Sequence, residues 1–177
     1  MLRLFAKRSA SRALADRLYR AIVARARHPG LYAGLGVADT LDGRFEMLML
    51  HVIVLVRRLR ADGAGELAQR LFDVMFADMD QALRELGVGD LAVPKRIRTM
   101  AEAYYGRSAA YEVALGPERP AEELVAVVAR NAFPDGHAGG AAERLAGYVR
   151  QLAAAVGGAS VADIAAGQVD WPDPAAA

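Results

Sequence analysis

Three histidines, His28, His51 and His137, are the side chains with a pKa nearest neutrality, and they lie far apart along the sequence. None belongs to an H-E-x-x-H or E-x-x-H pattern, which would mark a zinc-hydrolase or di-iron site. The serines have no G-x-S-x-G setting, cysteine is absent, and neither Gly-x-Gly turn carries the Lys-Ser/Thr of a phosphate loop. The sequence therefore predicts no catalytic residue, no metal site, no cofactor and no small-molecule substrate. A binding protein is favoured, with a small enzyme as an alternative.

Two polar residues lie on otherwise apolar helix faces. Asp78 is separated from Asp73 and Asp80 by roughly 140–160° around a helix, so the three cannot share one metal ion. A carboxylate on the apolar face needs a partner: either an arginine from a neighbouring helix or a bound client protein. His51 is either a packed, hydrogen-bonded helix residue or a group facing a cofactor or a proton path.

Two surfaces are candidates for binding a protein. Phe72 and Phe76 widen the apolar arc of the helix that carries them to roughly 200°, more than one neighbouring helix can cover. The next helix combines positive charge with an outward aromatic ring in a strip formed by Lys95, Arg96, Arg98, Tyr105 and Arg107. This strip is either an ordinary solvated helix face or a contact for RNA, acidic protein or lipid headgroups.

The candidate client- or partner-binding residues are Arg44, Phe45, His51, Phe72, Phe76, Asp78, Lys95, Arg96, Arg98 and Tyr105.

Apolar spacing predicts helices almost throughout, with no strand pair. The expected helices cover about Ser9–Arg27, Leu41–Ala61, Glu66–Leu86, Pro94 to the residue before Gly116, Pro120–Asn131 and Ala141–Val156, with one short turn after Ser160. The fold class is all-α, a single-domain bundle of about six to seven helices. The helix over 41–61 is apolar on every side in its middle, which predicts a central position, although its apolar run is too short to span a bilayer.

Helix-terminal residues support these boundaries. Asp39 or Thr40 is expected to cap the second helix, and Gly87 to end the third. Pro94 suits the first position of the fourth. Ser160 with Asp163 resembles a capping box.

Charge is unevenly distributed. The net charge is +1, but Met1 to Gly30 contains eight basic residues and one acid, which leaves −6 for the remainder. We expect a basic arm at 1–8, a helical domain at 9–167 and a flexible tail at 168–177. The arm suggests contact with an anionic membrane surface or with RNA, and the alternative is a solvated helix face. The residues for that contact are Arg3, Lys7, Arg8 and Arg12.

Five segments, together over half of the chain, resemble the ubiquinol–cytochrome c chaperone family, whose members assist assembly of the respiratory bc1 complex. They are LYRAIVARARHPGLY at 18–32, GVADTLDGRFEMLMLHV at 36–52, LFDVMFADMD at 71–80, LRELGVGDLAVPKRIRTMAEAYYGR at 83–107 and AYEVAL at 110–115.

The resemblance implies an all-α assembly factor without enzymatic turnover, whose client is cytochrome b or another bc1 subunit. It also implies a small assembly partner and a contact with the ribosome. Because the long N-terminal extension of the mitochondrial relatives is missing, we expect a bacterial member in the cytoplasm or at the inner face of the cytoplasmic membrane. The alternative is a membrane- or ribosome-binding adaptor that acts through the basic N-terminal segment.

Overall fold

A computed structural model describes residues 2–136 and 139–176, with side chains over 11–136 and 139–175. The described part contains seven α-helices and no strand: α1 (Leu2–Ala26), α2 (Leu41–Ala61), α3 (Gly65–Glu85), α4 (Val93–Ala114), α5 (Ala121–Ala132), α6 (Ala141–Gly158) and α7 (Val161–Ala166). The predicted all-α bundle of six to seven helices is confirmed.

Helix α2 is the centre of the bundle. It packs against α1, α3, α4, α5 and α6, and its buried stretch runs without interruption from Glu46 to Val56. A helix that is apolar on all sides has to be covered on all sides, which explains why the other long helices surround it. The central position expected from the sequence is confirmed.

Local signals fix the start of α2. The Thr40 hydroxyl accepts a hydrogen bond from the Gly43 N–H at 3.1 Å, so Thr40 rather than Asp39 is the cap. Gly43 is required by a close approach, because a Cβ there would lie 2.0 Å from the Ala38 carbonyl oxygen. The segment between α1 and α2 contains a π-helical turn at Gly30–Gly34.

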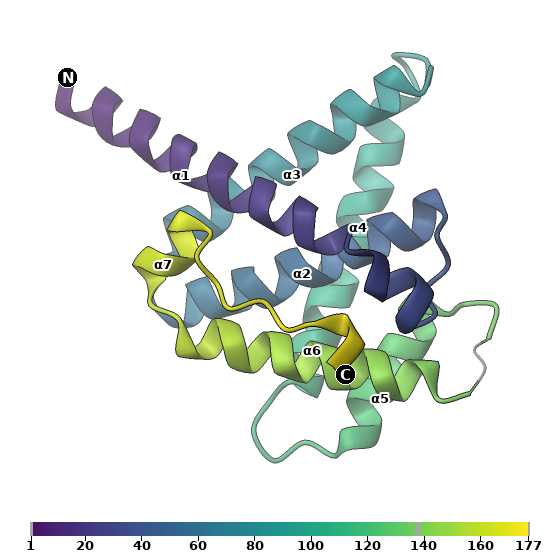
Figure 1. Ribbon diagram of the computed structural model, residues 1–177. Coiled ribbons are helices and arrows are strands. Elements are labelled where there is room, and N and C mark those ends of the chain that lie inside the picture. Colours follow the sequence, from purple (N-terminus) through teal and green to yellow (C-terminus); the bar gives the residue numbers. More distant parts are fainter. Residues whose placement is uncertain (1, 137–138, 177) are drawn as a thin grey trace.

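Helices α3 and α4 form an antiparallel hairpin that rises away from the rest of the bundle (Figure 1). Gly87 follows α3 with a φ of 79°, and Pro94 lies in the first turn of α4, both as predicted. The far end of this hairpin has no third helix packed over it in the figure.

The two ends of the chain differ from the expected helix bounds. Helix α1 begins at Leu2 rather than Ser9, and its first turns point away from the bundle (Figure 1). At the other end Val169 and Pro174 are buried and Trp171 lies 6.3 Å from His51 between ring centroids, contacts that a freely frayed tail would not make. The division into arm, domain and tail stays a prediction.

Candidate functional site: an apolar groove beside the α3–α4 hairpin

A groove of about 600 Å³, open to solvent, lies between the start of α2, the second half of α3 and the first half of α4. Its lining is mostly apolar: Leu41, Phe45, Met79, Ala82, Leu83, Leu86, Ala92, Met100 and Ala103, with Asp42, Lys95, Arg96 and Thr99 among them. We call the surface lined by these residues the groove. Its volume is in the range of ligand sites.

The groove forms because the apolar face of α3 continues to the end of this helix, where the neighbouring helices cover it only in part. Met79, Leu83 and Leu86 continue one helical stripe to the end of α3. Leu86 is 62% exposed and Leu41, at the start of α2, is 67% exposed. Contiguous exposed apolar side chains of this kind mark interaction surfaces.

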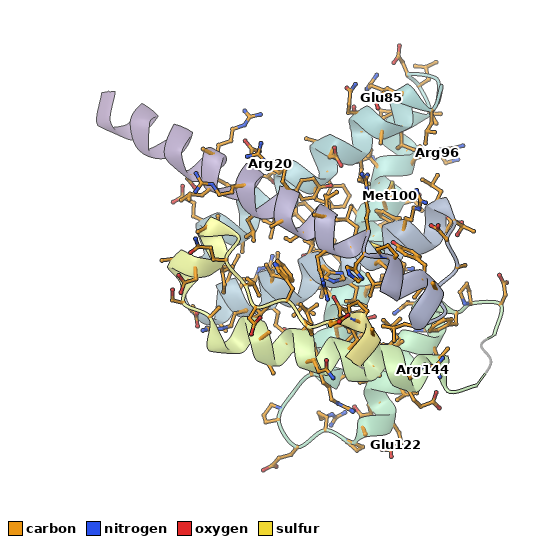
Figure 2. The ribbon with its side chains drawn as sticks, in the orientation of Figure 1. Arg20, Glu85, Arg96, Met100, Glu122 and Arg144 are labelled. Atoms are coloured by element: carbon orange, nitrogen blue, oxygen red, sulfur yellow. The ribbon has the colours of Figure 1, made fainter. Side chains whose placement is uncertain are left out.

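The charges of the groove differ between its walls. Lys95 and Arg96, on α4, are exposed and form no ion pair within the described part of the chain. Asp42 lies on the α2 side. Figure 2 shows Arg96 and Met100 along the first half of α4 and Glu85 near the end of α3. Arg98, on the same turn of α4, is exposed but does not line the groove.

Phe72 and Phe76 do not line the groove. They form an aromatic cluster with Tyr104 and Tyr105 nearer the bundle, with the Phe72 ring 4.5 Å from Phe76, 5.0 Å from Tyr104 and 5.8 Å from Tyr105. Both phenylalanines are half-buried, and Tyr105 is 57% exposed. The wide apolar arc of α3 therefore serves two purposes: this cluster at its middle and the groove at its end.

The expectation of an arginine partner for Asp78 is wrong. The carboxylate of Asp78 is exposed and accepts a hydrogen bond of 2.7 Å from the hydroxyl of Tyr19 on α1. Burial of Tyr19 together with this bond raises the pKa of its phenol. Because the carboxylate keeps its contact with water, a neutral donor is sufficient.

Asp78 also lines a smaller furrow of about 300 Å³ between α1, α2 and α3. This furrow shares Leu41, Phe45, Met79 and Ala82 with the groove, so the two are continuous. Arg44 lies at its edge in an exposed ion pair with Asp39 at 2.6 Å. Of the candidate binding residues, Phe45, Lys95 and Arg96 line the groove, and Arg44, Phe45 and Asp78 line the furrow.

His51 is fully buried and belongs to a hydrogen-bonded chain across three helices. Its Nδ1 lies 2.7 Å from the Met47 carbonyl oxygen, which can only accept, so Nδ1 carries the proton and Nε2 accepts from the Tyr148 hydroxyl at 2.7 Å. Arg25 of α1 donates to the same hydroxyl at 3.3 Å. Burial lowers the pKa of His51 to about 4. His51 lines neither the groove nor the furrow. Its contacts therefore favour a packed, hydrogen-bonded helix residue over a group that faces a cofactor or a proton path.

A buried ion pair was not predicted, and it engages Arg107, which the sequence had placed in the outward basic strip of α4. Glu46 of α2 is 4% exposed and its Oε2 accepts from Arg107 of α4 at 2.7 Å. Burial raises the pKa of Glu46, and Arg107 opposes that shift. A single glutamate in the apolar run at the start of α2 was the available signal, since such a residue needs a cation from a packed helix.

The basic N-terminal residues are described only in part. Arg12, Arg17 and Arg20 are exposed on α1, whereas the side chains of Arg3, Lys7 and Arg8 lie outside the described residues, as does His137. No group of three or more potential metal-ligating side chains occurs in the described part of the chain. Nor does any helix there combine the length and apolarity needed to cross a membrane.

The fold and the groove define an all-α protein with an open apolar groove between a central helix and a projecting hairpin. The family model described as ubiquinol-cytochrome C chaperone matches residues 33–171. The chain belongs to this family. The match extends through α5, α6 and α7, beyond the segments in which the sequence resemblance was seen.

A solved structure agrees with this assignment. The crystal structure of the Cbp3 homolog from Brucella abortus shares 39% sequence identity with this chain, covers 98% of it and 97% of its own length, and superposes with a TM-score of 0.81. Comparison with curated proteins gives no match.

Proposed function

We propose that this chain is a non-enzymatic assembly chaperone that binds newly made cytochrome b, or a related hydrophobic subunit, while the bc1 complex is built. The observation that carries the proposal is the groove, because a surface lined by Leu41, Phe45, Met79, Leu86 and Met100 is suited to covering an apolar helix. Membership of the ubiquinol-cytochrome C chaperone family supports the bc1 complex as the assembly to which that helix belongs.

The composition of the groove suits a chaperone better than an enzyme. Two methionines, Met79 and Met100, are half-buried in its lining, and this flexible side chain adapts to helices of different shape. An apolar surface open to solvent also lets a bound helix leave when the complex takes it up. We therefore propose reversible binding and no turnover.

A second role is proposed for the outer face of α1. Arg12, Arg17 and Arg20 are exposed there and form no ion pair within the described residues. Such a row can contact an anionic membrane surface or ribosomal RNA. This contact would place the groove near the site where membrane subunits are made.

The test is complementation of a strain that lacks the gene, with assembled bc1 complex measured on native gels. The double variant L41D/L86D places two charges in the groove at positions that are already exposed, so folding should be retained. We expect assembled complex to fall to the level of the deletion strain.

Val113→Asp is the matched control, because Val113 is 55% exposed on α4 but outside the groove. It should restore the complex as wild type does. Normal bc1 levels with L41D/L86D, at wild-type abundance of the variant, would refute the proposal.

A further inference from the structure

We propose that the groove recognises about three turns of an amphipathic α-helix whose acidic residues lie against the α4 wall. This inference rests on the proposed function and specifies the chemistry of the segment that is bound. It is carried by the shape of the groove and by the unpaired charges on one of its walls.

The dimensions of the groove favour a short helical segment. The α4 wall runs from Ala92 to Ala103, about 16 Å at 1.5 Å per residue. That length matches about 11 residues of helix, whereas a membrane-spanning helix is about 30 Å long. The walls are helices, and the described part of the chain has no strand edge to which a peptide strand could be added.

The apolar lining sets the pattern that the bound helix needs. Met79, Leu83 and Leu86 form one wall and Met100 with Ala103 the other, with Phe45 from α2 between the hairpin and the bundle. A partner that places apolar side chains at i, i+3, i+4 and i+7 would fill such a groove.

The charges determine which flank of the bound helix is acidic. Lys95 and Arg96 are exposed on the α4 wall and have no acidic partner within the described residues. On the α3 side of the hairpin, Arg84 is already paired with Asp80 and Asp90. Asp42, across the groove, would repel acidic residues on that side. Among the residues that line the groove, the free positive charge thus lies on the α4 wall.

The test uses the full chain and three synthetic helical peptides of 14 residues with the same leucine face and with flanks of glutamate, glutamine or lysine. Binding is measured by fluorescence anisotropy at low salt and at about 1 M salt. We expect the glutamate peptide to bind about tenfold more tightly than the lysine peptide at low salt. The difference should disappear at about 1 M salt, where the screening length is about 3 Å.

Charge-reversal variants test whether the preference for the glutamate peptide comes from the α4 wall of the groove. K95E/R96E should reverse the order of the glutamate and lysine peptides, and its new acids near the start of α4 are compatible with the helix dipole. Arg98→Glu also reverses the charge of an exposed cation, but one outside the groove. This variant should still bind the glutamate peptide more tightly than the lysine peptide. The double variant L41D/L86D should weaken all three peptides.

Equal binding of the glutamate and lysine peptides, an order that K95E/R96E leaves unchanged, or no binding of any peptide would each overturn this inference. None of these results would alter the outcome of complementation with L41D/L86D. Failure of the charge preference is therefore distinguishable from failure of the proposed function.

Discussion

At the scale of single residues, the polar side chains within the bundle mostly hold helices together. His51 joins α2 to α6 through Tyr148, and Glu46 joins α2 to α4 through Arg107. Each is hydrogen-bonded to a residue of another helix, which offsets the cost of removing it from water. The exposed residues near the hairpin therefore remain the candidates for binding.

The histidine has a predictable effect on stability. Its pKa is about 4 in the folded chain and about 6.5 in an unfolded one. As pH falls from 6.5 toward 4, His51 becomes protonated in the unfolded chain but stays neutral in the folded one. The free energy of unfolding is therefore unaffected above pH 6.5 and decreases as pH falls through this window. The loss is at most on the order of 3 kcal/mol.

Urea unfolding at several pH values would measure this loss. His51→Asn should be less stable than wild type at pH 7, because the hydrogen bonds to Met47 and Tyr148 are disturbed. Its stability should fall less between pH 6.5 and 4 than that of wild type. Parallel curves for the two proteins in this window would contradict the assignment of a neutral buried His51.

Residue partners were harder to predict than residue positions. The spacing of Asp78 placed it on the apolar side of its helix but gave no information about which side chain of another helix it meets. That partner is Tyr19, which lies 59 positions away in the sequence and meets Asp78 where α1 crosses α3. Helix periodicity contains no such information, and neither did it indicate that Arg107 faces Glu46.

At the scale of elements, the boundaries that carry a capping signal were predicted best. Helix α2 spans Leu41–Ala61 as expected because Thr40 caps its start and Gly63 follows its end. The π-helical turn at Gly30–Gly34 was missed, since its hydrogen bonds, such as Leu35 N–H to the Gly30 carbonyl, leave no clear side-chain pattern.

The cap of α2 is itself testable. Thr40→Ala removes the acceptor for the Gly43 N–H and should cost about 1 kcal/mol of unfolding free energy. Thr99→Ala, an exposed threonine inside α4, should change stability by less than about 0.5 kcal/mol. Thermal unfolding of both variants gives the comparison, and an equal effect would show that Thr40 does not act as a cap.

At the scale of the whole molecule, the groove exists because the hairpin is longer than the body that packs against it. The sequence predicted the excess apolar surface on α3 but placed it at Phe72 and Phe76, whose exposure is reduced by Tyr104 and Tyr105. The groove lies about one to three turns beyond Phe76, at Met79, Leu83 and Leu86. The packing of α1, α2 and α4 against α3 decides which part of the arc is covered.

The proposed function makes one central claim: this chain covers an apolar helix of a bc1 subunit beside its α3–α4 hairpin. The most direct measurement is site-specific photo-crosslinking in growing cells, with the photoreactive residue at position 86 inside the groove or at position 113 outside it. The account predicts a crosslink to newly made cytochrome b from position 86 and none from position 113. Equal crosslinks from both positions, or none from position 86 while bc1 assembly still depends on the chain, would contradict it.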